Sequence, residues 1–154
     1  MVACSYRRLH MLAVMADRVA VCVFEAFLLF FDHVESHPYL PQWDLLDYCR
    51  KNGIVLQAFA ALGHSSEPKL LEDPVISAVA KRVNKTPAQV LLSWAIQRGT
   101  ALLTTSKTPS RIKENFEVST LPEEAVREIS EGITSRVRFN AVVETGVPGF
   151  IPRG

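Results

Sequence analysis

Histidine and tyrosine occur close together in the segment HVESHPYLPQ, which spans residues 33–42. His37 precedes Tyr39 by two residues, and Pro38 and Pro41 lie on either side of the tyrosine. Imidazole and phenol groups can both donate a proton, so this spacing raises the hypothesis of a catalytic acid. The prolines favour the alternative, a turn between a strand and a helix in which both side chains are structural.

A second polar segment, TTSKTPSRIKEN, spans residues 104–115 and follows a short apolar run. A strand that leads into a helix offers free backbone N–H groups and the positive end of the helix dipole, which suit a phosphate. Ser106, Lys107 and Arg111 add a hydroxyl, an ammonium and a guanidinium group, and arginine can hold a phosphate with two hydrogen bonds. From residue types alone, a solvated polar loop is the favoured interpretation.

A third segment, FAALGHSSEP, spans residues 59–68. Gly63 and the two serines allow close approach of a ligand to the backbone, and Phe59 offers a flat face to an aromatic ring. Taken alone, the segment favours a plain connection between a strand and a helix, with the phenylalanine in the core.

The elements that must position these segments follow from short apolar runs and helix-capping signals. Nearly continuous apolarity over 30–35, 53–60 and 101–105 predicts parallel strands that are covered on both faces. Helices are predicted over 41–53, from Asp73 to about Val83, from Thr86 to Gly99, from Thr108-Pro109, and from Thr120 to about Ile133.

Capping signals fix where these helices begin. Asp73 is the expected N-cap of the second helix, and Thr86 with Gln89 forms an expected capping box for the third. Thr120 with Glu123 repeats that signal before the last helix. The alternation of strands and helices predicts a parallel α/β fold, within which a doubly wound sheet and a (β/α) barrel stay open.

Composition excludes several classes of function. The 154 residues include 17 basic and 16 acidic side chains, so the net charge of +1 gives no bulk attraction to nucleic acid. The three cysteines, Cys4, Cys22 and Cys49, suggest neither a disulfide framework nor a zinc site. We therefore expect a reducing, cytoplasmic location and no metal.

The two ends of the chain differ from the middle in composition. Residues 1–31 are apolar but contain Asp17 and Glu25, which disfavours both a signal peptide and a membrane helix, so membrane association is a minor alternative. Residues 139–154 are rich in glycine and proline and predict an extended loop.

The order of motifs along the chain resembles the C-terminal half of the aldo-keto reductases. HPYLPQ with LLDYC, AF-x-x-LG, TPAQVLLSWAIQRG, TSKTPSRIKEN and PEEAVREI occur in the family's order between about His33 and Ile133. The resemblance implies part of a (β/α)8 TIM barrel that binds cofactor at the carboxyl ends of its strands. It also implies NADPH-dependent reduction of small aldehydes and ketones.

The resemblance also assigns residues near the nicotinamide and pyrophosphate. His33 stands where the family has a glutamine beside the nicotinamide carboxamide, which is a departure, and Phe59 corresponds to the aromatic residue that stacks on the ring. Ala60, Leu62 and His64 correspond to the small residues that line the pyrophosphate, with Ala60 in place of a serine.

The segment after the third strand carries the implied contacts to the adenosine end. Ser106 and Arg111 match contacts to the 2′-phosphate, and Glu114 and Asn115 match contacts to the adenine. Thr105 replaces the family's lysine, for which Lys107 compensates in part. NADPH is therefore the expected cofactor, with NADH as an alternative.

The family's catalytic tyrosine, lysine, aspartate and histidine belong to its first four strands, which residues 1–31 do not resemble. Tyr6 and His10 lack the accompanying motif, and no lysine precedes Lys51. We therefore predict three parts: an atypical segment 1–31, the family's half-barrel 32–138 and a C-terminal loop 139–154. Such a chain is a truncated reductase without its own catalytic residues, or alternatively a non-catalytic nucleotide-binding or scaffold fragment. Open barrel edges make self-association an option.

Overall fold

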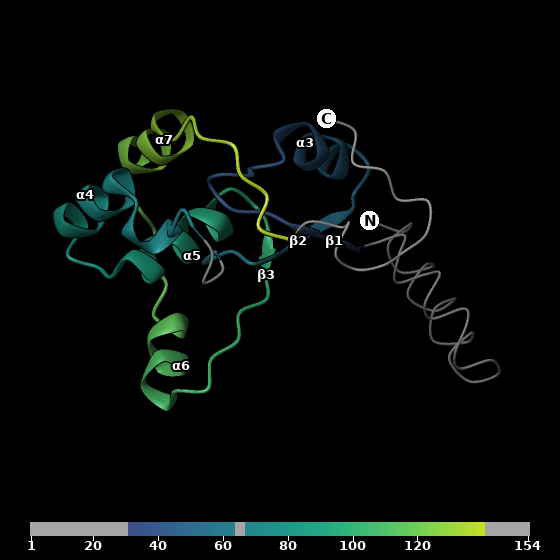
Figure 1. Ribbon diagram of the computed structural model, residues 1–154. Helices are drawn as coiled ribbons and strands as arrows, with labels where there is room; N and C mark the ends of the chain where they lie inside the picture. The colour runs from purple at the N-terminus through teal and green to yellow at the C-terminus, as the bar shows by residue number, and fades with distance from the viewer. Residues whose placement is uncertain (1–30, 64–66, 141–154) are drawn as a thin grey trace.

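The computed structural model describes residues 31–63 and 67–140. Within them, β1 (Phe31–Glu35), β2 (Val55–Phe59) and β3 (Ala101–Leu102) form a three-stranded parallel sheet in the order β1-β2-β3 (Figure 1). β3 is shorter than the predicted run over 101–105, although the Leu103 N–H still donates to the Ala58 carbonyl at 3.0 Å. The predicted parallel α/β fold is confirmed, and the sheet is not closed into a barrel.

Helices alternate with the strands as predicted. α3 connects β1 to β2, a short 3-10 helix and two α-helices connect β2 to β3, and two more follow β3. Figure 1 shows α6 set apart from α3, α4 and α7. No helix in the described residues is long and apolar enough to cross a membrane. The elements are α3 (Trp43–Lys51), η1 (Leu70–Glu72), α4 (Pro74–Val83), α5 (Pro87–Gln97), α6 (Pro109–Phe116) and α7 (Glu123–Gly132).

Two of the three predicted caps are confirmed. The Asp73 carboxylate accepts hydrogen bonds from the backbone N–H groups of Val75 at 2.8 Å and Ile76 at 3.3 Å. Thr86 and Gln89 exchange both bonds of a capping box, at 3.2 and 3.1 Å. Because each cap satisfies N–H groups that the helix leaves unpaired, each contributes about 1 kcal/mol of stability.

The third predicted cap is wrong. α7 begins at Glu123 with Pro122 as its N-cap residue and has no side-chain cap, so Thr120 lies two residues too early. A tertiary contact fixes this part of the chain, because the Leu121 N–H donates to the Gln97 side chain at 2.9 Å. That contact sets the entry of the chain into α7 and overrides the local sequence signal.

The main core forms around α5. Its predicted apolar face is buried, and it packs with residues from α4 and α7. Burying such side chains stabilises the fold by about 1.5–3 kcal/mol each. The α5 members are Val90, Leu91, Trp94 and Ala95, and their partners include Ile76, Val79, Ala125 and Ile129.

The Arg98 side chain is buried between two tryptophans. Its guanidinium carbon lies 4.2 Å from the Trp43 ring centroid and 4.6 Å from that of Trp94, and Nη2 donates to the Pro41 carbonyl. Burial lowers the pKa of Arg98 to about 10, with a smaller contribution from the charge of Arg50. The group is therefore still cationic at neutral pH, and the two ring faces offset part of its lost hydration.

We predict that Arg98→Lys lowers the free energy of unfolding by about 1–3 kcal/mol, because an ammonium ion cannot lie flat on an indole ring as a planar guanidinium does. Urea unfolding at pH 7 measures the effect. Arg127→Lys, at an exposed position of α7, is the matched control and should change stability by less than about 0.5 kcal/mol. Equal unfolding midpoints for the two variants would contradict the stacking role.

Candidate cofactor-binding site

The predicted site residues lie in or after three strands that end at the same edge of the sheet. β1, β2 and β3 run parallel and end at Glu35, Phe59 and Leu102. The loops that carry the candidate residues therefore start side by side at the carboxyl edge, which is where parallel α/β folds place their ligand sites.

His33 and Phe59 form a ring pair at this edge. Their ring centroids lie 5.0 Å apart with an interplanar angle of 42°. His33 is exposed and Phe59 is half-buried. A phenyl face next to an imidazole edge offers a planar ligand both stacking surface and a hydrogen-bonding group.

A tight turn follows β2 at residues 60–63. The Gly63 N–H donates to the Ala60 carbonyl at 2.8 Å, and Ala60 has a positive φ of 54°. A left-handed conformation costs a non-glycine residue about 1–2 kcal/mol, and such strain gathers at ligand-binding loops. The Leu62 side chain packs against the main core, so that residue can offer a ligand only its backbone. His64 lies outside the described residues.

The loop after β3 turns into α6 through Ser106. Its hydroxyl accepts a hydrogen bond from the Thr108 N–H at 3.2 Å, and the N-terminus of α6 has no side-chain cap. Thr105, Lys107 and Arg111 are all exposed around this helix end. An uncapped helix N-terminus with two nearby cations is suited to an anion.

Glu114 is partly engaged within the protein. Its Oε1 accepts a hydrogen bond from the Thr86 hydroxyl at 2.6 Å, which ties α6 to the N-cap of α5. Asn115 beside it is half-buried. Glu114 therefore has its second oxygen for a ligand, and the bond to Thr86 fixes its position.

The donor set fits a phosphorylated dinucleotide, with three departures. The ring pair, the left-handed turn and the cationic helix end supply a stacking surface, close backbone approach and phosphate binding. His33 stands where the family's pattern has a glutamine, Ala60 lacks a hydroxyl and Thr105 lacks a positive charge.

A model of the aldo/keto reductase family matches residues 28–133. The chain belongs to that family. Dihydrodiol dehydrogenase 3 of Bos taurus is 43% identical over 122 residues, which are 73% of this chain and 38% of that protein. Glycerol 2-dehydrogenase (NADP(+)) of Saccharomyces cerevisiae is 44% identical over 103 residues, which are 65% of this chain and 33% of that protein.

A solved structure of the family shows the same fold. The crystal structure of an aldo/keto reductase from Brucella melitensis superposes with a TM-score of 0.60 and 34% identity, covering 66% of this chain and 38% of that one. The chain thus spans well under half the length of these relatives, and its open sheet is part of the family's barrel.

His37 and Tyr39 have structural contacts, as their flanking prolines indicate. His37 is fully buried and bonds to the Glu35 carboxylate at 2.9 Å. The Tyr39 hydroxyl donates to Asp73 at 2.9 Å. Burial, together with that bond and the negative charge of Asp73, raises the pKa of Tyr39 to about 12. Neither group is placed as the acid of the predicted cofactor site.

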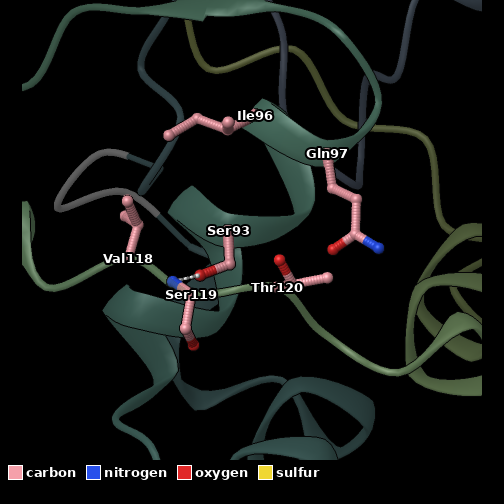
Figure 2. A pocket seen from close by; sticks show the side chains of 6 residues that line it. All are labelled: Ser93, Ile96, Gln97, Val118, Ser119 and Thr120. Atoms are coloured by element: carbon pink, nitrogen blue, oxygen red, sulfur yellow. Dashed lines mark hydrogen bonds between the residues drawn. The ribbon is translucent and has the colours of Figure 1, made fainter.

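A shallow cavity of about 280 Å³ lies elsewhere, between α5 and residues 118–120 (Figure 2). Figure 2 shows Ser93 among the side chains that line it, and the Ser93 hydroxyl accepts a hydrogen bond from the Ser119 N–H at 3.2 Å. None of the predicted cofactor residues lines this cavity, so it does not enter the site.

The raised pKa of Tyr39 predicts a pH-dependent contribution to stability. A tyrosine whose pKa rises on folding favours the folded state fully below its unfolded pKa near 10, and this contribution is lost as pH rises toward 12. The free energy of unfolding of the native chain should therefore exceed that of Tyr39→Phe by less at pH 11.5 than at pH 9, as measured by urea unfolding.

A difference in the free energy of unfolding that stays constant over that pH range would contradict the proposed contribution of Tyr39 to stability. Tyr48→Phe removes a hydroxyl from a side chain that is 60% exposed. Tyr48→Phe is therefore the control for loss of a tyrosine hydroxyl, and at pH 8 it should lower the free energy of unfolding by less than about 0.5 kcal/mol.

Proposed function

We propose that this chain carries the nucleotide-binding half of an NADP(H)-dependent aldo/keto reductase, which reduces aldehydes or ketones to alcohols by hydride transfer. The observation that carries the proposal is the meeting of three candidate loops at one edge of a parallel sheet in a chain of this family. The name of the yeast relative, glycerol 2-dehydrogenase (NADP(+)), agrees with the cofactor class.

Each end of the cofactor has its own candidate residues. His33 and Phe59 would contact the nicotinamide, and the turn formed by Ala60, Leu62 and His64 would approach the pyrophosphate through backbone groups. The pairing of the His33 and Phe59 rings supports the first assignment, and the positive φ of Ala60 supports the second.

The adenosine end would bind at α6. Ser106 and Arg111 would hold the 2′-phosphate, while Glu114 and Asn115 would contact the adenine. Lys107 would supply part of the charge that Thr105 lacks. The uncapped N-terminus of α6 supports an anion there, because its N–H groups and dipole favour negative charge.

The nicotinamide cofactor would supply the hydride, and the reaction would also require an acid that protonates the developing alkoxide. We propose that these 154 residues lack that acid, because no tyrosine accompanied by the family's lysine, aspartate and histidine occurs in the sequence. The chain by itself is then a nucleotide-binding protein without appreciable reductase activity.

A second candidate function is a non-catalytic nucleotide-binding or scaffold role. The departures at His33, Ala60 and Thr105 favour it, because His33 replaces the family's glutamine, Ala60 removes a hydroxyl and Thr105 removes a positive charge from the proposed contacts to the cofactor. A small carbonyl compound is the proposed substrate of the first candidate alone. Both candidates share three predictions: no nucleic acid as partner, a cytoplasmic location, and self-association through the edges that β1 and β3 leave open among the described residues.

Arg111→Ala should weaken binding of NADPH about tenfold or more and leave NADH nearly unchanged, because only NADPH has the 2′-phosphate that a guanidinium can hold with two hydrogen bonds. Cofactor titration followed by fluorescence measures both affinities. Lys113→Ala is the matched control, since it removes one positive charge from the same helix. Equal losses for both cofactors would remove the 2′-phosphate assignment.

Oxidation of NADPH in the presence of a reactive nitrobenzaldehyde should stay at the level of a protein-free blank, because the chain lacks a positioned proton donor. Absorbance at 340 nm follows the reaction. Turnover that persists in the double variant Tyr6→Phe, His10→Ala would contradict the proposed absence of a catalytic centre, since those residues are the candidates before β1.

A further inference from the structure

The Glu35 carboxylate is buried at the end of β1 and receives three hydrogen bonds. His37 Nε2 lies 2.9 Å from Oε1, the Phe139 N–H donates to Oε1 at 2.6 Å, and the Asn140 N–H donates to Oε2 at 3.0 Å. The Glu35 and His37 side chains have no exposed surface. Burial raises the pKa of Glu35, but the hydrogen bonds outweigh burial and hold that pKa below its ordinary value.

Two of these donors come from the segment that follows α7. Figure 1 shows this segment, drawn in yellow, returning from α7 to the strands. A backbone bond from the Val137 N–H to the Tyr39 carbonyl at 3.1 Å attaches it a second time. Residues 137–140 are therefore fixed to the turn after β1 by contacts that span about a hundred residues of chain.

The Phe139 side chain connects the turn after β1 to the turn after β2. Its ring centroid lies 4.8 Å from that of His37 and 6.1 Å from that of Tyr39. A Cβ added at Gly63 would lie 3.4 Å from the Phe139 ring and 3.0 Å from the Leu70 side chain. The ring thus packs against the turn of residues 60–63, in which Ala60 has its strained conformation.

We propose that Glu35 is a positioning residue for the turn of residues 60–63. Its carboxylate holds the backbone of Phe139 and Asn140, and the Phe139 ring in turn supports Gly63 and keeps the left-handed turn in place. The consequence for nucleotide affinity rests on the proposed function, whereas the consequence for the turn itself does not. Residues 137–140 then support the candidate site through this turn.

Three variants of the full chain test the proposal. Glu35→Gln leaves a side chain of the same size but replaces one acceptor oxygen with an NH₂ group that faces an N–H donor. Glu131→Gln removes the same charge from an exposed position of α7 and is the matched control. Phe139→Ala removes the ring and leaves the buried Glu35–His37 pair, so it tests the second step where Glu35→Gln lowers the yield of folded protein.

Tryptic cleavage after the exposed Arg138 measures how firmly Phe139 and Asn140 are held, because Arg138 directly precedes Phe139. Cleavage at the Arg138–Phe139 bond is compared with cleavage at the exposed Lys107–Thr108 bond in the same sample, by mass spectrometry. Loss of a charge-assisted hydrogen bond should raise this ratio roughly tenfold in Glu35→Gln. Glu131→Gln should leave it unchanged, and an unchanged ratio in Glu35→Gln would overturn the attachment.

Hydrogen exchange of the Gly63 amide and titration with NADPH read the position of the turn. Glu35→Gln and Phe139→Ala should both increase the exchange rate of the Gly63 amide and weaken the binding of NADPH several-fold, whereas Glu131→Gln should change neither. Faster cleavage at Arg138 with unchanged exchange at Gly63 would overturn the positioning role. If the native chain does not bind NADPH, the proposed function fails, and the exchange measurement still decides the inference about the turn.

Discussion

A buried carboxylate must be compensated by hydrogen bonds, and this requirement at Glu35 fixes the position of residues 137–140. Leaving such a charge unpaired would cost several kcal/mol, which is a large fraction of the stability of a domain of this size. Two of its three donors are backbone N–H groups 104 and 105 residues further along. The turn after β1 and the segment after α7 are therefore folded as one unit, and through Tyr39 and Asp73 this unit includes the N-terminus of α4.

Signals carried within a few residues predicted the fold well. Asp73 caps α4 and Thr86 caps α5 because donor and acceptor are neighbours in sequence, and the periodic apolar face of α5 is buried as expected. Thr120 failed because the contact between Leu121 and Gln97, 24 residues apart, fixes the start of α7. No pattern of neighbouring residues predicts the bond from Phe139 to Glu35 or the contact of Arg98 with the tryptophans. Each depends on partners that only the folded chain brings together.

The candidate site was predictable mainly through the order of motifs. Residue types made a phosphate possible at Ser106 and Arg111, but taken alone they favoured a plain loop both there and around Phe59. The folded chain adds contacts that no motif contains: Glu114 bonds to Thr86, and the Leu62 side chain belongs to the core. Because these residues hold the loops in place, their side chains are only partly available to a ligand, and their backbone matters more than their type.

The departures from the family's pattern are unevenly distributed along the proposed cofactor. His33 and Ala60 fall on the proposed contacts to the nicotinamide and pyrophosphate, and Thr105 on the region of the pyrophosphate and 2′-phosphate. Ser106, Arg111, Glu114 and Asn115 match the family's residues at the adenosine end. Under the proposed function, most binding free energy then comes from α6, where a charged phosphate meets an arginine and a helix N-terminus. The nicotinamide contributes less to affinity and has less to orient it. Such a site can keep nucleotide affinity after the geometry needed for hydride transfer has been lost, because binding depends on the adenosine end and transfer depends on the nicotinamide.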